Sequence, residues 1–314
     1  RYMKFLDSIS NDYILPMGWI GDWGSMVNGW KEGQPESVPT AFYYWDAMIL
    51  SKIAKVLNNE GDRLFYKKLA NDIRAAYNRK YFNHETVNYT DGSQMANAFP
   101  LYLGIVPEDA KNKVLENLVN DIEIKNGNHL TTGVLGTKYM PEALAMFGRT
   151  DVAWSIINQK TYPGWNSMME KYTTVCEFWT LKQSKNHVMM GSIDAWFYKY
   201  IAGIQIDETN PAFSAFIIKP NILAGLSKAE GKTETIRGTV SSKWNHESGK
   251  FTLEVVVPFN CKAKIFLPAE QSAEILENEI PVRNIKEVEY IGYSDGFHQL
   301  QVNSGSYNFI ALKK

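Results

Sequence analysis

Cysteine is scarce in this sequence: Cys176 and Cys261 are the only two among 314 residues. They lie far apart in the chain, on opposite sides of a domain boundary predicted between residues 206 and 207. Two such cysteines build neither a disulfide framework nor a Cys-x-x-Cys metal site. Cysteine usage therefore leaves the redox compartment undecided.

Long apolar runs and an excess of charge of either sign are absent as well. Without a run of about 18 apolar residues, no membrane-spanning helix is predicted and no membrane partner is expected. Residues 1–6 lack the cleavage site of a signal peptide, and the chain starts abruptly within an amphipathic pattern. Because 33 Lys and Arg nearly balance 34 Asp and Glu, no basic field favours nucleic acid as a ligand.

Several motifs of catalysis and cofactor binding are also missing. The sequence contains no Gly-rich phosphate loop, no Gly-x-Ser-x-Gly elbow and no His, Cys, Asp or Glu cluster with metal-ligand spacing. No cofactor and no metal are therefore expected. Hydrolysis by carboxyl groups is the chemistry that the sequence favours.

Aromatic residues, by contrast, are abundant at 13%, including 9 Trp and 17 Tyr. Such side chains fill cores, and they also stack on the apolar faces of sugar rings. Many of the tryptophans stand beside Gly, Asp, Asn or Glu in loop-like sequence: Trp19, Trp23, Trp30, Trp165 and Trp179. This placement favours a binding cleft over a core.

Residues 1–206 read mainly as helix. An apolar stripe marks residues 39–57, made of Phe42, Trp45, Met48, Ile49, Ile53 and Val56. After Gly61-Asp62 a second helix is predicted at 63–82, followed by helices at 93–103, 107–121, 139–147, 151–159 and 191–204. Short Gly-, Asn- or Pro-containing connections separate them, which is typical of antiparallel helix pairs.

Residues 207–314 have a different texture. The polar segment 207–211, which ends in Pro211, is the predicted linker. Short β-branched and aromatic runs then appear at 233–244, 251–257 and 263–267, broken by turn-like sequences. An antiparallel β-sandwich is predicted for this part of the chain.

Two acidic residues stand out as candidates for carboxyl chemistry. Glycoside hydrolysis uses a pair of carboxyl groups that flank the scissile bond. Glu177 lies between Cys176 and Phe178-Trp179, a setting too apolar for a routine solvated acid, and Asp22 lies between Gly21 and Trp23. Glu170 and Glu142 come next. A structural cap for Glu177 and a turn former for Asp22 remain open as alternatives.

Two histidines are further candidates. His187 precedes the last predicted helix and has the donors to bind a sugar hydroxyl or a carboxylate. His129, in Asn128-His129-Leu130, has a similar standing. A structural role at a helix start is the alternative for both.

An ordered series of segments resembles a known enzyme family. The segments are Gly21-Asp22-Trp23, Leu130-Thr131-Thr132-Gly133-Val134-Leu135-Gly136-Thr137, Tyr162-Pro163-Gly164-Trp165, Thr173-Thr174-Val175-Cys176-Glu177-Phe178-Trp179 and Asn186-His187 followed by Gly191-Ser192. Together they resemble the catalytic domain of the family 78 glycoside hydrolases, the α-L-rhamnosidases. The resemblance covers roughly residues 1–225 and is more specific as a set than in any single piece.

The resemblance implies a six-hairpin (α/α) barrel followed by a C-terminal β-sandwich. It also implies an inverting mechanism with one glutamate as general acid and another as general base. Glu177 matches the base. The acid belongs to an Asp-Glu-Arg-x-Gly-Trp type segment that these 314 residues do not contain. We therefore expect the first helices of the barrel to be missing from this chain, and the chain alone to be inactive.

By the same resemblance, five residues are expected at the sugar: Asp22, Trp30, His187, Trp165 and Trp179. Asp22 would bind ring hydroxyls, Trp30 would pack on the apolar side of the ring, and the other tryptophans would wall the cleft. The sequence departs from the family pattern at three places, where Cys176, Phe178 and Val188 replace a tryptophan, an arginine and an aromatic residue. These departures leave the base in place and put the identity of the sugar in doubt.

Three functions remain in competition. The first is hydrolysis of terminal α-L-rhamnosides in a rhamnose-containing glycan or glycoside, which favours a periplasmic or extracellular setting without excluding the cytoplasm. The second is another inverting (α/α) barrel hydrolase or lyase, acting on a different deoxysugar or a uronic acid. The third is a carbohydrate-binding protein without catalysis. A helical repeat module has little support, because no fixed period is visible.

Overall fold

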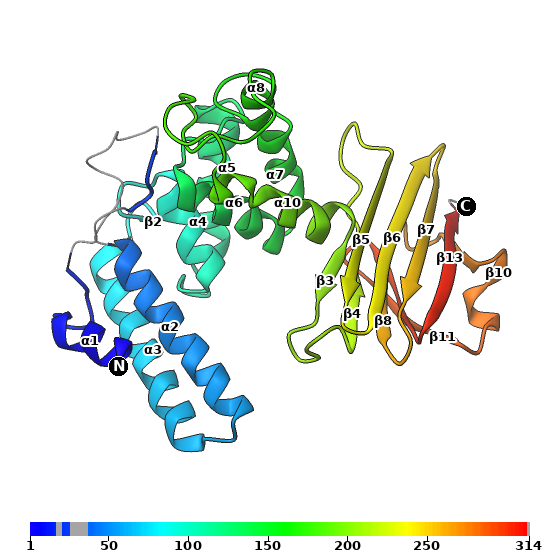
Figure 1. Ribbon diagram of the computed structural model, residues 1–314, viewed down its shortest axis with the longest axis horizontal. Helices are drawn as coiled ribbons and strands as arrows, with labels where there is room; N and C mark the ends of the chain where they lie inside the picture. The colour runs from blue at the N-terminus through cyan, green and yellow to red at the C-terminus, as the bar shows by residue number, and fades with distance from the viewer. Residues whose placement is uncertain (17–20, 26–36, 313–314) are drawn as a thin grey trace. The chain divides into compact units, whose positions relative to one another are not determined.

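The computed structural model describes residues 1–16, 21–25 and 37–312. The chain divides into two compact units, Arg1–Ser192 and Ile193–Lys314. The first unit is built of helices, and the second consists mainly of two β-sheets (Figure 1). This agrees with the predicted order of a helical part followed by a sheet part; the exact boundary at residues 206 and 207 stays a prediction.

Helices account for most of the first unit. They are α1 (Tyr2–Ile9), α2 (Ser37–Val56), α3 (Glu60–Tyr81), α4 (Gln94–Leu103), α5 (Lys111–Asn120), α6 (Val134–Met146), α7 (Thr150–Ile157), α8 (Trp165–Met169), α9 (Val188–Gly191) and, in the second unit, α10 (Ile193–Trp196). Single π-helical turns, Asp121–Lys125 and Phe197–Ile201, continue α5 and α10. A two-residue hairpin, β1 (Phe82–Asn83) with β2 (Asn88–Tyr89), connects α3 to α4.

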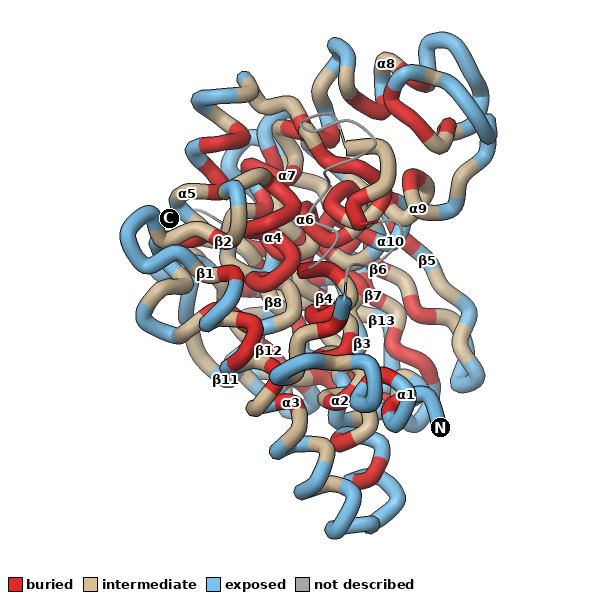
Figure 2. Tube along the Cα trace, turned by 90° about the vertical axis from the view of Figure 1, so that its left-hand side faces the viewer, coloured by how far each residue is buried: buried red, intermediate tan, exposed pale blue. Residues whose placement is uncertain are grey.

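The α2–α3 hairpin packs through small side chains. Ala47 and Ala54 of α2 are buried, and Ser51 between them donates its hydroxyl to the carbonyl of Arg63 at 2.9 Å. The large residues of the expected stripe behave differently, since Ile53 and Val56 are 47% and 80% exposed. Much of the outer side of this hairpin is accordingly exposed in Figure 2. The stripe identified the helix correctly, but it did not identify the face that α3 covers.

The core of the helical unit lies around α4 and α6. Phe99 on α4 and Tyr139 on α6 are both buried, with ring centroids 5.0 Å apart. Gly104 ends α4 in a left-handed conformation with φ of 72°, which favours glycine. Helix α6 begins at Val134, five residues earlier than the predicted start at Tyr139. The cause of the earlier start is a set of hydrogen bonds from its first N–H groups to Asp22.

The second unit contains a six-stranded and a five-stranded sheet. The strands are β3 (Ile204–Ile206), β4 (Ala215–Ile218), β5 (Lys228–Thr235), β6 (Gly238–Glu247), β7 (Lys250–Val257), β8 (Lys262–Pro268), β9 (Glu274–Glu277), β10 (Ile280–Pro281), β11 (Val288–Ser294), β12 (Phe297–Val302) and β13 (Gly305–Leu312). Their orders are β10-β9-β13-β7-β6-β5 and β11-β12-β8-β4-β3. Among these strands all neighbours are antiparallel except β4 and β8, which are parallel.

Alternation of side chains places the core between the sheets. Along β7 the residues Phe251, Leu253, Val255 and Val257 are buried, while those between them are more exposed. The run expected at 233–244 is a hairpin instead of one strand, because Thr235 pairs with Gly238 and the chain turns between them. On β6, the buried Trp244 donates its indole N–H to the carbonyl of Ile201 at 2.8 Å.

A helix that crosses a bilayer needs about 20 predominantly apolar residues. None of the described helices is long and apolar enough to cross a membrane.

Candidate active site

Glu177 lies in a loop that is closed by its own backbone. The N–H of Glu177 donates to the carbonyl of Ser184 at 2.9 Å, and the N–H of Ser184 donates to Oε2 of Glu177 at 3.3 Å. The flanking residues Cys176 and Phe178 are buried, whereas Glu177 is only partly buried. The loop is thus anchored on both sides of a carboxylate that solvent still reaches.

A second donor holds the other oxygen of this carboxylate. Nε1 of Trp23 donates to Oε1 of Glu177 at 3.2 Å, across 154 positions of sequence. Within the described residues no Lys or Arg forms an ion pair with Glu177. Both donors are therefore neutral, and they orient the carboxylate without cancelling its negative charge.

Aromatic packing supports the Trp23 side of this contact. The rings of Trp23 and Phe178 have centroids 5.8 Å apart at a tilt of 58°. Gly24 lies directly against this pair, since a Cβ there would come within 3.1 Å of the Phe178 ring. Its φ of +81° also favours glycine. The Gly-Asp-Trp segment therefore contacts the residue that immediately follows the candidate base.

Asp22 has an interior position, 4% exposed. Its Oδ2 accepts the N–H of Gly133 at 2.7 Å, and its Oδ1 accepts those of Leu135 at 3.0 Å and Gly136 at 2.8 Å. Burial raises the pKa of Asp22 to about 6, and the three backbone donors oppose that rise. Asp22 therefore caps α6 from another part of the chain, and this contact explains the early start of that helix.

Trp165 and Trp179 lie together in the interior. Their ring centroids are 5.2 Å apart in a T-shaped arrangement, and the residues are 6% and 2% exposed. The indole N–H of Trp165 donates to the carbonyl of Met190, and that of Trp179 to the carbonyl of Thr132, both at 3.0 Å. Both indole donors are thus used inside the protein. The expected contact of these rings with sugar stays a prediction.

The two histidines differ in their hydrogen bonding. The backbone N–H of His187 donates to the carbonyl of Val175 at 3.0 Å, beside the Glu177 loop, and its Nδ1 is buried with no partner among the described residues. Nε2 of His129 lies 2.7 Å from the hydroxyl of Thr161, and its Nδ1 lies 3.0 Å from the carbonyl of Asn126. Both ring nitrogens of His129 thus have partners, whereas one ring nitrogen of His187 has none in the part of the chain that the structure describes.

Comparison with known families gives a consistent result. A family model described as the bacterial alpha-L-rhamnosidase 6 hairpin glycosidase domain matches residues 1–201. A second one, described as the bacterial alpha-L-rhamnosidase C-terminal domain, matches residues 203–279. The chain belongs to the bacterial α-L-rhamnosidase family. The resemblance to the family 78 glycoside hydrolases is thereby confirmed.

Solved structures of α-L-rhamnosidases share this fold. The enzyme from Dictyoglumus thermophilum is 33% identical with a TM-score of 0.90, over 99% of this chain and 36% of its own. The Streptomyces avermitilis enzyme, solved with L-rhamnose, is 27% identical with a TM-score of 0.90, over 98% and 30%. An α-L-rhamnosidase of Formosa agariphila is 27% identical over 99% of this chain and 35% of its own. The rhamnosidase-family chain thus spans about a third of the length of these relatives.

Of the residues expected at the sugar in this rhamnosidase-family chain, Trp30 lies outside the described residues, as does Trp19. From the sequence, Trp23 was identified as a loop tryptophan and as part of the Gly21-Asp22-Trp23 segment, but no role was predicted for its indole, which binds Glu177. Its place in the Gly-Asp-Trp segment was the available signal. A single sequence does not reveal that this indole contacts a side chain 154 positions further along the chain.

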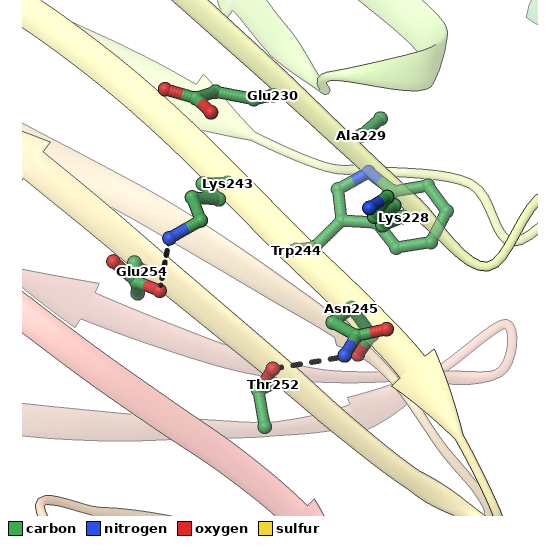
Figure 3. A pocket seen from close by; sticks show the side chains of 8 residues that line it. All are labelled: Lys228, Ala229, Glu230, Lys243, Trp244, Asn245, Thr252 and Glu254. Carbon is green, nitrogen blue, oxygen red and sulfur yellow. Dashed lines mark hydrogen bonds and ion pairs between the residues drawn. The ribbon is translucent and has the colours of Figure 1, made fainter.

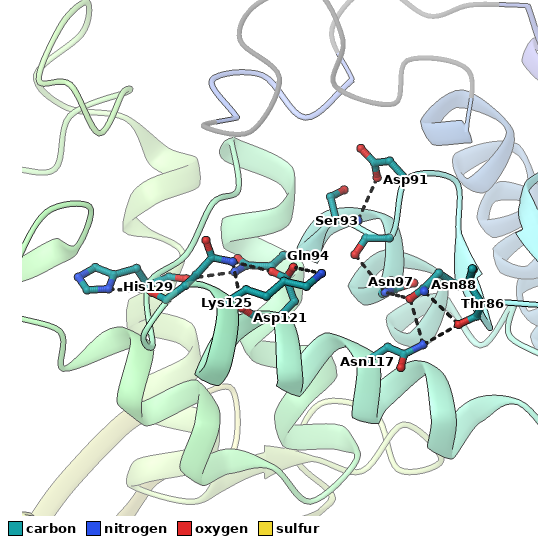
Figure 4. Close-up of polar contacts among 12 residues, drawn as sticks. Thr86, Asn88, Asp91, Ser93, Gln94, Asn97, Asn117, Asp121, Lys125 and His129 are labelled. Carbon is teal, nitrogen blue, oxygen red and sulfur yellow. Dashed lines mark hydrogen bonds and ion pairs between the residues drawn. The ribbon is translucent and has the colours of Figure 1, made fainter.

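Gln94 is a second residue that sequence reasoning missed in the rhamnosidase-family chain. It is fully buried at the start of α4, where its Nε2 donates to the carbonyl of His129 at 3.1 Å and its Oε1 accepts the N–H of Thr131 at 2.8 Å. Figure 4 shows this side chain beside the backbone at His129. Gln94 thus fixes the stretch that leads into the start of α6.

A cavity of about 440 Å³ lies in the second unit, over β5, β6 and β7. Its lining residues are Lys228, Ala229, Glu230, Lys243, Trp244, Asn245, Thr252 and Glu254 (Figure 3). The carboxylate of Glu254 is held there by Lys243 at 2.9 Å. Since this acid is charge-paired, the cavity does not resemble the setting of Glu177. No group of three His, Cys, Asp or Glu in the described ranges is placed to hold a metal ion.

Proposed function

We propose that this protein hydrolyses terminal α-L-rhamnosides with inversion of the anomeric centre, and that Glu177 is the general base. The observation that carries the proposal is the contact set of Glu177: one oxygen on the Trp23 indole, the other on the Ser184 N–H, and no cation among the described residues. Membership of the family and the likeness to an enzyme solved with L-rhamnose support the choice of sugar.

In the proposed reaction Glu177 takes a proton from a water molecule, whose oxygen attacks the anomeric carbon. A carboxylic acid on the opposite side of the sugar gives its proton to the glycosidic oxygen as that bond breaks. The products are the free sugar with inverted configuration and the aglycone alcohol. Room for the water requires the two carboxyl groups to lie about 6.5–9.5 Å apart.

We further propose that the acid comes from a part of the enzyme outside these 314 residues, on helices that complete a six-hairpin barrel. The helical hairpins of the first unit support this, together with the share of the relatives that the chain spans. The chain by itself is then expected to hydrolyse an aryl α-L-rhamnoside at least about 100-fold more slowly than the full-length enzyme, because proton donation is lost.

For the sugar pocket we propose His187 and Trp30 as direct contacts. The backbone hydrogen bond from His187 to Val175, beside the Glu177 loop, supports its part in this assignment. Trp165 and Trp179 form the packed wall behind the Glu177 loop, which their burial supports. Asp22 uses both oxygens on the backbone of α6, so we assign it to the support of the pocket.

The decisive experiment is Glu177→Gln in the full-length enzyme. We expect kcat for an aryl α-L-rhamnoside to fall at least about 1,000-fold, while L-rhamnose still binds in calorimetry. Glu254→Gln in the second unit is the matched control and should keep wild-type kcat. Proton NMR of the wild-type reaction should show the β-anomer of L-rhamnose first. Near-normal turnover by Glu177→Gln, or the α-anomer first, would overturn the assignment.

A further inference from the structure

The first backbone N–H groups of α6 all donate hydrogen bonds to two residues near the start of the chain, Asp22 and Trp23. Helix starts leave several backbone N–H groups without intrahelical partners. Here the carboxylate of Asp22 accepts the N–H groups of Gly133, Leu135 and Gly136. The carbonyl of Trp23 accepts that of Val134 at 2.8 Å. The four consecutive backbone N–H groups of residues 133–136 therefore bind Asp22 and Trp23. We call these four residues the seat.

The two glycines of this seat are required by space. A Cβ at Gly133 would lie 2.1 Å from the carbonyl oxygen of Trp23, and one at Gly136 would lie 2.5 Å from Cγ2 of Thr132 and 3.0 Å from Oδ2 of Asp22. Neither site tolerates such a contact without backbone movement. The glycines of the segment Leu130–Thr137 thus have a physical reason. The backbone of Asp22 and Trp23 lies against Gly133, and the side chains of Thr132 and Asp22 lie against Gly136.

The segment that carries Glu177 is tied to the same seat. Trp179, two residues after Glu177, donates its indole N–H to the carbonyl of Thr132 at 3.0 Å. On the other side, the hydroxyl of Ser25 donates to the carbonyl of Thr131 at 3.2 Å. The segment of the donor, Trp23, and the segment of the acceptor, Glu177, are therefore both hydrogen-bonded to the backbone of residues 131–136.

We propose that Asp22 and Trp23 are positioning residues for Glu177: Asp22 locks the segment onto α6, and the Trp23 indole holds Oε1 so that the carboxylate faces the attacking water in one orientation. This proposal rests on the proposed function of Glu177. It assigns Trp23 a role through its N–H group, which differs from a role of its ring against sugar. A merely packed Trp23 would need only its ring against Phe178.

A first test requires no activity and is made on the 314-residue chain with ¹⁵N-labelled indoles. The Trp23 Nε1–H resonance is assigned by its loss in Trp23→Phe. At fixed neutral pH, Glu177→Ala should move this resonance upfield, because a hydrogen bond to a carboxylate is lost. Asp22→Asn should move it in the same direction with Glu177 intact. The Trp244 indole, bound to Ile201 in the other unit, should not move in Glu177→Ala. An unmoved Trp23 resonance in Glu177→Ala overturns the proposal, whatever Asp22→Asn does.

A second test uses the full-length enzyme. Trp23→Phe keeps an aromatic ring beside Phe178 and removes the donor. We expect kcat to fall about tenfold, the value of one hydrogen bond to a charged group, with KM within about twofold.

The control is Trp244→Phe, the same change at a buried indole donor in the second unit. It should lower the melting temperature and leave kcat and KM unchanged. A wild-type kcat in Trp23→Phe would overturn the positioning role while leaving the base assignment intact. If Glu177→Gln itself stays active, the proposed function fails, and the resonance test still decides whether the contact exists.

Discussion

Two glutamates, one in each unit, show what distinguishes a candidate base from an ordinary surface acid. Glu254 lies on the outer face of a sheet, 58% exposed, and Lys243 neutralises it at 2.9 Å. Glu177 lies in a loop between buried residues and is held by the neutral N–H groups of Trp23 and Ser184. Lys243 brings a compensating positive charge to Glu254, whereas the two donors at Glu177 orient the carboxylate and carry no charge of their own. The partners of an acid, more than its exposure, thus separate the two.

The support beneath the two acids differs as well. Beneath Glu254 lies a regular sheet, in which Lys243 and Glu254 are direct neighbours on β6 and β7. Beneath Glu177 lies irregular backbone fixed by long-range contacts to residues 131–136. In a regular sheet, a surface side chain can change with little effect on the backbone. In the seat, one added methyl group would clash with the backbone of Trp23. Three changes of decreasing effect test this difference.

The largest effect is expected for Gly133→Ala. The added methyl group would lie 2.1 Å from the carbonyl oxygen of Trp23, so the backbone must move and the free energy of unfolding should fall by about 3 kcal/mol. Gly61→Ala is the control, because a Cβ there meets only Oδ1 of Asn59 at 3.7 Å and the site is helical. It should be neutral or slightly stabilising. Urea unfolding measures both, and equal effects would contradict a tight seat.

The next effect concerns pH and Asp22. Its pKa in the folded protein, about 6, lies above the ordinary 3.8. The folded state therefore binds this proton more readily, and the contribution of Asp22 to the free energy of unfolding falls as pH rises from about 4 to about 6.

Asp22→Asn removes this titration, and its amide N–H₂ also faces a backbone donor in either orientation. The variant should be less stable than wild type at neutral pH. The gap should widen on the order of 2 kcal/mol as pH falls from 6 to 4. Urea unfolding at several pH values measures the gap, and a constant gap would contradict the raised pKa.

The smallest effect is expected for Lys243→Gln in the sheet. The ion pair with Glu254 is exposed on both sides, and such pairs add little to stability. The free energy of unfolding should change by no more than about 1 kcal/mol, and hydrolysis by the full-length enzyme should be unaffected. Calorimetry and a rate assay check both; a clear loss of activity would place a function in the second unit.

Much of the fold was predictable from local patterns. The two helices of the α2–α3 hairpin followed from the apolar stripe and the predicted second helix, although Gly61-Asp62 lies in the first turn of α3 and the chain turns at residues 57–59 instead. Strands β7 and β8 followed from alternating β-branched residues. The start of α6 was not predictable, because its first N–H groups are satisfied by Asp22, 111 to 114 positions away. The parallel pair of β4 and β8 depends on chain crossing between distant strands and has no local signal either.

The candidate site divides in the same way. Glu177 and His187 were singled out by residue type, by local composition and by ordered motifs, all of which are properties of short segments. The Trp23 contact and the seat on residues 133–136 required the folded chain, since they join positions more than 100 residues apart. By itself, the sequence determined the order of a helical and a sheet domain, the family and the acid to test. The tertiary structure decided which neighbours hold that acid, because hydrogen-bond partners depend on distances in space that a linear pattern does not contain.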